Sequence, residues 1–257
     1  MSIPKLIQRW RLLAVLSTAL LLMAITAFLL HPGMPGVHSD LRLTARTSFI
    51  LFLAAFSASS IRKLWPSAWS RWQLANRRYL GLSFAVSHSL HLIGIASFAL
   101  VQPQRFREDN DVSTLVIGGI AYAFIFAMAA TSFDRSAAWL GPRRWKLLHT
   151  VGSYYIWATF TIVLVTFALD VPRYWVGVAL LVLVLLLRLI ARWTQRRHSF
   201  VESTPAASTQ WRGPRRGPRR QVRLPHPNAP VVLASHACRT VEGQAASVDR
   251  RLSGNLS

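Results

Sequence analysis

The sequence has one cysteine, Cys238, and few charged side chains, and each shortage excludes a class of protein. A lone cysteine cannot form an internal disulfide, build a cysteine-ligated zinc site or hold an iron–sulfur cluster. Charged residues make up 15% of the 257 residues, against about 25% in a typical soluble domain. Hydrophobic residues make up 52%. This composition favours an integral membrane protein over a soluble one.

Six apolar segments, separated by charged loops, are the expected membrane spans. A hydrocarbon core of about 30 Å requires about 20 helical residues. The first segment is longer than a signal-peptide core and lacks an A-x-A-like cleavage site, so we interpret it as a retained helix. We predict an all-α bundle in residues 1–195, with spans at 12–30, 43–61, 79–102, 112–133, 147–169 and 174–191. The last span includes Arg188, whose side chain is expected to snorkel to the membrane surface.

Lysine and arginine are concentrated in alternate loops. The net charge of +21 comes from 30 Lys and Arg against 9 Asp and Glu. The richly basic segments are the N-terminus, the loops 62–78 and 135–146, and the stretch from Arg188 onward. The positive-inside rule then predicts a multi-pass protein of the inner (cytoplasmic) membrane with both termini in the cytoplasm. Nucleic-acid binding is the other interpretation of such charge, but the basic residues flank apolar segments, so we expect no specific nucleic-acid partner.

From residue 196 the composition changes to arginine, proline, glycine and serine. The motif Gly213-Pro214-Arg215-Arg216 is repeated immediately as Gly217-Pro218-Arg219-Arg220. Such a segment cannot bury enough apolar surface to fold. We therefore predict a disordered cytoplasmic tail over residues 196–257. Its expected partner is the anionic lipid surface, at ~1 kcal/mol per basic residue near the membrane; RNA or an acidic protein is the alternative.

Three histidines fall inside the predicted spans: His88 and His91 in the third and His149 at the start of the fifth. Ionisable groups in a membrane are costly and mark functional sites. His88 and His91 are three residues apart and so share one helix face. Histidines on two helices suit axial ligation of haem, although hydrogen bonds between helices or a polar cavity are alternatives. No carboxylate or thiolate joins them, which disfavours zinc, and no acidic residue is expected in any span, which disfavours a carboxylate proton relay.

The motifs around these histidines resemble a known family. Arg77-Arg78-Tyr79-Leu80-Gly81-Leu82, followed by His91, is similar to the Arg-Arg-x-Leu-Gly-Leu…His signature of ferric-reductase-like transmembrane domains. The most similar branch contains the haem-binding membrane subunit of the bacterial periplasmic methionine-sulfoxide reductase system. The resemblance covers roughly residues 1–195. Further matching elements are Thr131-Ser132, Leu140-Gly141, Arg144-Trp145, Leu148-His149 and, more distantly, Arg42-Leu43-Thr44-Ala45-Arg46.

The resemblance implies a haem-b electron-transfer subunit that serves a partner reductase on the outer face. The donor would be a quinol or a cytoplasmic flavin reductase, and FMN or a quinone is a possible additional cofactor. No glycine-rich dinucleotide fingerprint occurs in the chain, so a separate donor is needed. The implied iron ligands are His91 and His149; His88, one turn before His91, is a further candidate because its depth matches that of His149 better. The implied partners of the haem propionates are Arg77, Arg78 and Arg144.

The sequence departs from the family pattern in two places. Arg42 replaces an early histidine, and Phe160-Thr161-Ile162-Val163 replaces a second histidine about thirteen residues after the first on the fifth span. At ~1.5 Å per residue, His91 lies ~20 Å beyond Arg78 but His149 only ~7 Å beyond Arg144, so the two are not level. Three arrangements stay open: His88 with His149 on one haem, His91 with a non-histidine partner, or partly lost haem sites.

Two other function classes compete with electron transfer. The missing histidine favours a haem-free structural or assembly protein derived from the same family. A small-solute transporter would show internal repeats or broken helices. Gly118-Gly119 is the one hint of such a break, and adjacent small residues more often allow close helix packing.

Overall fold

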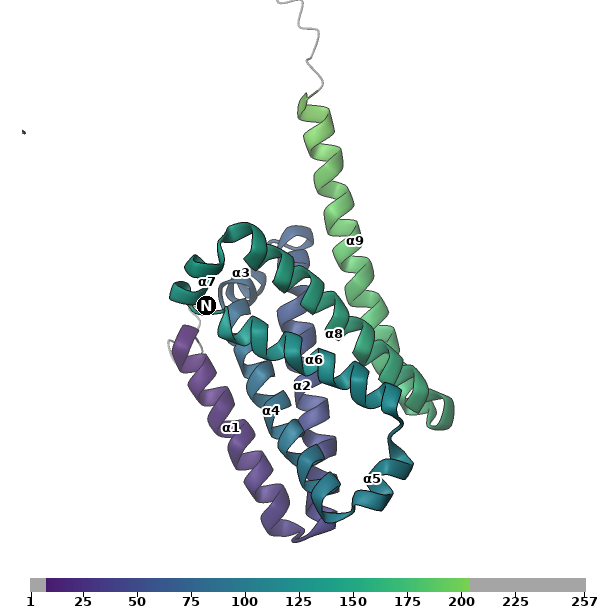
Figure 1. Ribbon diagram of the computed structural model, residues 1–257. Coiled ribbons are helices and arrows are strands. Elements are labelled where there is room, and N and C mark those ends of the chain that lie inside the picture. The colour runs from purple at the N-terminus through teal and green to yellow at the C-terminus, as the bar shows by residue number, and fades with distance from the viewer. Residues whose placement is uncertain (1–7, 204–257) are drawn as a thin grey trace, which may run out of the picture. The chain divides into compact units, whose positions relative to one another are not determined.

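A computed structural model describes residues 8–203, with side chains up to residue 195, and every regular element in that part of the chain is a helix (Figure 1). The predicted tail beyond residue 203 lies outside the described residues. The elements are α1 (Arg9–Leu30), α2 (Met34–Leu64), α3 (Ala68–Ala75), α4 (Arg77–Val101), α5 (Pro103–Asp109), α6 (Val112–Ala130), α7 (Asp134–Leu140), α8 (Pro142–Asp170), η2 (Pro172–Tyr174) and α9 (Trp175–Ser203).

Six helical segments in the described residues are long and apolar enough to cross a membrane. They are α1, α2, α4, α6, α8 and the stretch Pro172–Gln195, which joins η2 to most of α9. The short helices α3, α5 and α7 connect them. The hydropathy of these segments confirms the prediction of an all-α, multi-pass membrane protein.

Two predicted boundaries are wrong. α2 begins at Met34 rather than at residue 43, because Gly33 adopts a φ of +79° that ends the turn and a proline follows in the first helical turn. Asp40 consequently lies on the helix that contains the second predicted span, near the amino end of that helix. α9 continues to Ser203, past the predicted limit of the folded region at residue 195, since no glycine or proline interrupts it.

Contacts between distant segments place the basic loops at one end of the bundle. The backbone N–H of Arg9 donates to Oδ1 of Asn76 at 2.7 Å, which joins the starts of α1 and α4. Lys63 Nζ donates to Oε1 of Gln195 at 2.7 Å, which joins the end of α2 to α9. We call the end at which α1 and α4 begin and α2 finishes the basic end; it is the upper end in Figure 1.

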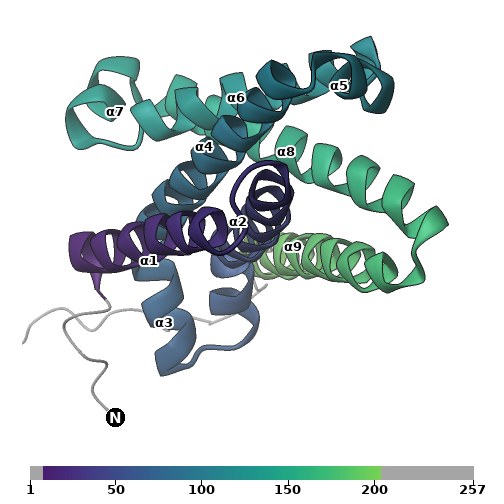
Figure 2. The ribbon, with the colours of Figure 1, turned by 90° about the horizontal axis from the view of Figure 1, so that it is seen from below.

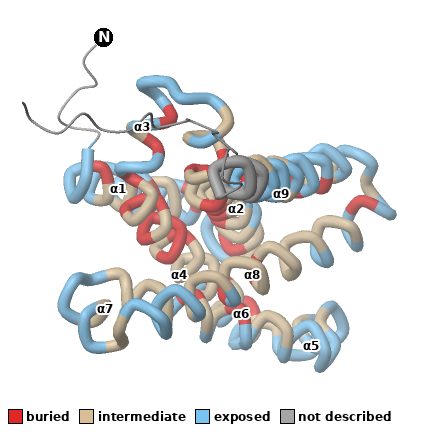
Figure 3. Tube along the Cα trace, turned by 90° about the horizontal axis from the view of Figure 1, so that it is seen from above, coloured by how far each residue is buried: buried red, intermediate tan, exposed pale blue. Residues whose placement is uncertain are grey.

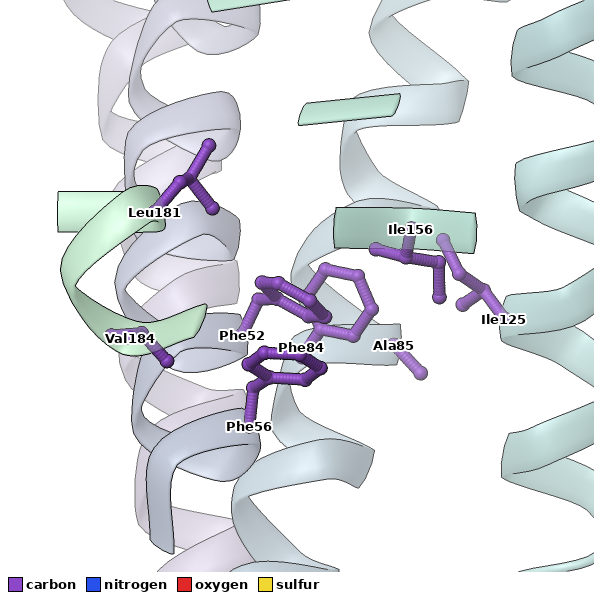
Figure 4. Close-up of a cluster of buried hydrophobic side chains, with 8 residues drawn as sticks. All are labelled: Phe52, Phe56, Phe84, Ala85, Ile125, Ile156, Leu181 and Val184. Carbon is purple, nitrogen blue, oxygen red and sulfur yellow. The ribbon is translucent and has the colours of Figure 1, made fainter. Parts of the chain in front are cut away.

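The core is built from aromatic and branched side chains of five helices. Its buried members, shown in Figure 4, are Phe52, Phe56, Phe84, Ala85, Ile125, Ile156, Leu181 and Val184. Viewed along the bundle, α2 lies among α1, α4, α8 and α9 (Figure 2). Large apolar side chains on the outer surfaces remain exposed, for example Leu29 at 73%. That pattern fits lipid rather than water as the surrounding solvent.

Small polar residues fill the contact between α2 and α4, which we call the α2–α4 seam and define by Thr44, Thr47, Ser48 and Ser87. Thr44, Ser48 and Ser87 are fully buried, and buried positions concentrate along these two helices in Figure 3. Ser48 Oγ donates to Ser87 Oγ at 2.9 Å, and Thr47 Oγ1 lies 2.9 Å from the same atom. Small residues let the backbones approach closely, and hydroxyls then bond across the helices.

The connection before α6 is capped by an acidic residue. The Asp111 carboxylate accepts hydrogen bonds from the Ser113 hydroxyl and from the hydroxyl and backbone N–H of Thr114. Because these donors favour the charged form, with Ser113 the largest contributor, they lower the pKa of Asp111 to about 2. The carboxylate therefore stays charged at neutral pH and caps the amino end of α6.

Candidate functional site

A hydrogen bond to Thr44 of the α2–α4 seam defines the tautomer of His91. Its Nδ1 lies 3.0 Å from Thr44 Oγ1, and the same hydroxyl donates its single proton to the Asp40 carbonyl at 2.6 Å. The hydroxyl can then only accept from His91, so the proton of the neutral imidazole is on Nδ1. This leaves the lone pair on Nε2. A histidine that donates through one nitrogen to a fixed acceptor and presents the other is the usual arrangement of a metal-ligating imidazole.

His88 lies in an aromatic environment. Its ring stacks on His91 with centroids 5.3 Å apart and lies 4.9 Å from Tyr122, 5.3 Å from Phe84 and 6.0 Å from Phe160. Its Nδ1 is buried and has no hydrogen-bond partner among the described residues. A buried nitrogen without a partner is uncommon, because it has lost its water without gaining a hydrogen bond. His88 therefore supports the face of His91 and carries an unsatisfied nitrogen of its own.

His149 is held by a second threonine, near the basic end. Its Nε2 lies 3.2 Å from Thr131 Oγ1, which donates to the Ala127 carbonyl at 2.7 Å, so Nε2 is the donor and Nδ1 carries the lone pair. The Trp145 ring stacks on His149 at 4.2 Å and its Nε1 donates to the Thr131 carbonyl at 2.9 Å. The sequence elements Thr131-Ser132 and Trp145…His149 thus meet in one cluster.

The described residues bring His88 and His91 together but do not bring His149 to them. The residue of α8 that lies against His88 is Phe160, eleven positions after His149 in the chain. At ~1.5 Å per residue, this corresponds to ~16 Å along the helix. The arrangement therefore gives no support to one haem shared by His88 and His149. Phe160 itself belongs to the segment where the family pattern has a second histidine.

The three candidate arginines have different surroundings. Arg77 is half-buried and acts electrostatically on His149. Arg78 forms an ion pair with Asp134 of α7 at 2.7 Å, so it already has an acidic partner. Arg144 is exposed. Of the three, Arg77 is the one that acts electrostatically on a candidate histidine.

Sequence reasoning missed several residues of this region. Tyr122 and Asp40 belong to no motif, and Thr44 lies in the element 42–46 without being singled out; Asp40 has a buried carboxylate oxygen without a hydrogen-bond partner in the described part of the chain. The expectation that Arg188 snorkels is wrong: it is 8% exposed, and its Nη1 donates to the Phe56 carbonyl at 3.1 Å. The sequence did contain a signal of this burial: Arg188 is a single arginine inside a leucine-rich segment, and a cation there needs partners within the bundle.

If the chain binds haem, His91 Nε2 would hold its iron. The free lone pair on Nε2 and the Thr44 hydrogen bond on Nδ1 are what an iron-bound imidazole requires. In residues 8–203 no group of three or more His, Cys, Asp or Glu side chains converges as in a multi-ligand metal site. An open cavity of about 540 Å³ lies between α1, α4 and α6 and is lined by apolar side chains and two serines, without any of the histidines.

Comparison with known proteins gives no relative: no family model, no curated protein and no solved structure matches this chain. Function must therefore be argued from the geometry of the histidines and arginines.

Proposed function

We propose that this chain is a haem-b membrane subunit that passes electrons across the cytoplasmic membrane to a partner oxidoreductase. The supporting observation is His91, whose Nδ1–H is fixed by Thr44 and whose Nε2 is left with its lone pair inside a spanning helix. A bound haem would supply one-electron redox chemistry that side chains lack. The proposal agrees with the resemblance of the His91 and His149 segments to ferric-reductase-like domains.

The chain's own residues hold and tune this site. Thr44 orients the His91 ring and raises the basicity of Nε2. His88, stacked at 5.3 Å, and Tyr122 behind it keep water from that face. Near the basic end, Arg77 offers charge to an anionic group such as a haem propionate. We propose a quinol or a cytoplasmic flavin reductase as donor, with FMN or quinone as a further cofactor, and a partner reductase on the outer face as acceptor.

Electron transfer can be tested in proteoliposomes that contain trapped ferricyanide. When an impermeant reductant is added outside, we expect the protein to accelerate the loss of ferricyanide absorbance, and His91→Ala to abolish that acceleration. Equal rates for the wild type and His91→Ala would overturn the proposal. The Arg42→Gln variant, at an exposed position on α2, is a control for nonspecific leakage.

We further propose that the basic end faces the cytoplasm, with both termini on that side. Cys238 is the single cysteine of the chain and serves as a natural label. An impermeant maleimide is expected to leave it unlabelled in intact cells and to label it in inside-out membrane vesicles. Labelling in intact cells would place the C-terminal part on the outer side and contradict this orientation.

One observation favours a second candidate, a haem-free structural or assembly protein. Phe160 and Tyr122 lie against the His88 ring, where a second ligand would otherwise approach. In this case the histidine–threonine hydrogen bonds serve helix packing alone. The triple variant His88→Ala, His91→Ala, His149→Ala distinguishes the two. If the wild-type protein is colourless and the triple variant keeps its partner binding, with stability lowered only by the loss of the histidine–threonine hydrogen bonds, the haem-free role is favoured.

A further inference from the structure

Arg188 is a buried cation near the basic end of α9. Its guanidinium lies 3.9 Å from the centre of the Phe56 ring and 5.0 Å from that of Tyr154, and it donates to the Phe56 carbonyl. These contacts satisfy part of its five N–H donors, and the two ring faces stabilise part of its charge, but no carboxylate of the described residues neutralises it. A buried charge without a counter-charge is costly, and removal of water strengthens its attraction for any anion that reaches it.

Other arginines approach the same place. Arg192, one turn further along α9 and exposed, lies 5.4 Å from the Tyr154 ring, so Tyr154 contacts both guanidinium groups. Arg77 of α4 and Arg192 are close enough to repel Arg188 electrostatically. Arg62 of α2 has a buried Nη1 without a hydrogen-bond partner in the described part of the chain. We call Arg77, Arg188 and Arg192, with Tyr154 between the last two, the arginine cluster.

The cluster has no acidic partner among the side chains that the structure describes. Asp134 is the acidic residue at the basic end in that part of the chain, and Arg78 forms its salt bridge. The other described carboxylates are on the opposite half of the bundle: Asp40, Glu108, Asp109, Asp111 and Asp170. Repulsion within the cluster is thus offset by aromatic rings and not by a carboxylate of the described residues, which favours an anion from outside the chain.

We propose that the arginine cluster binds the phosphate of an anionic membrane phospholipid. Arg188 lies within the segment Pro172–Gln195, which is apolar enough to span a membrane, about two helical turns before its basic end, and Arg192 lies one turn nearer to that end. Basic residues between spanning helices are a recurrent binding site for anionic headgroups. Exposed Arg192 meets the phosphate, and Arg188 beneath it adds charge and donors. Exposed leucines on α9, such as Leu189, lie beside the acyl chains.

Native mass spectrometry of the full-length, delipidated protein tests this site. The protein is titrated with dioleoyl-phosphatidylglycerol, with the zwitterionic dioleoyl-phosphatidylcholine, and with inorganic phosphate. We expect phosphatidylglycerol to bind more tightly than phosphatidylcholine, and Arg188→Gln or Arg192→Gln to weaken it by about fivefold each, from ~1 kcal/mol per basic residue. Arg173→Gln, which removes the same charge at the opposite end of the last span, is expected to change nothing.

Specific outcomes would overturn the proposal. Equal binding of the two lipids, or wild-type phosphatidylglycerol binding by both Arg188→Gln and Arg192→Gln, excludes a phosphate site at the cluster. Displacement of the lipid by millimolar inorganic phosphate assigns the site to a free anion instead. Because Arg192 is exposed, its variant decides the matter if Arg188→Gln does not fold. Lipid binding should also persist in His91→Ala, which separates this site from haem binding.

Discussion

Replacement of His91 by alanine is expected to remove haem from the purified protein, with a fall in haem content of about tenfold or more. Thr44 of the α2–α4 seam holds the proton of the His91 imidazole on Nδ1, so Nε2 keeps the lone pair that can bind iron. Loss of this ligand leaves no equivalent atom at the same place. The measurement is the ratio of Soret to protein absorbance after purification from haem-replete cells.

His149→Ala is the informative comparison for that experiment. His149 lies ~16 Å along α8 from Phe160, which is the α8 residue in contact with the His88 ring. We therefore expect this variant to keep most of its haem. If His149→Ala loses as much haem as His91→Ala, both histidines hold the cofactor and the assignment to His91 alone is wrong.

Thr44→Val is expected to weaken haem binding by about 10- to 100-fold while the protein stays folded. Valine keeps the shape of threonine but cannot accept the proton of His91 Nδ1. The ring is then free to change tautomer and orientation, so Nε2 can carry the proton in place of the lone pair that would bind iron. The measurement is haem affinity by titration of the haem-free protein, with thermal stability followed in parallel.

Thr47→Val supplies a matched control on the same helix. Thr47 Oγ1 bonds to Ser87 across the seam and not to His91, so its loss affects packing without affecting the ligand. Its cost should be that of an interhelical hydrogen bond, ~0.6 kcal/mol. Equal loss of haem affinity in Thr44→Val and Thr47→Val would show that the seam matters only for folding.

Much of the fold follows from composition and charge. Six spans and the gathering of basic segments at one end were predictable, because apolar length and Lys/Arg distribution are local properties. The start of α2 at Met34 was not, since the residues before 43, Arg42 among them, lie outside the apolar segment. The helix passes through Arg42 and Arg46, and each is exposed on its outer face.

The site itself was only partly predictable. The candidate histidines are visible in the sequence because ionisable residues are rare in spans, but their tautomers depend on Thr44 and Thr131, which belong to other helices. The burial of Arg188 depends likewise on Phe56 of α2, far from it in the chain. Such contacts between distant segments leave no periodic trace in a single sequence. The pairing of His88 with Phe160 is of the same kind.

The central claim is that this bundle holds haem b through His91. The most direct test is the absorption spectrum of the wild-type protein purified from haem-replete cells, recorded oxidised and after reduction. We expect a Soret band and sharp α and β bands on reduction, with the pyridine derivative of b-type haem. A colourless protein that also fails to bind added haem would contradict the account.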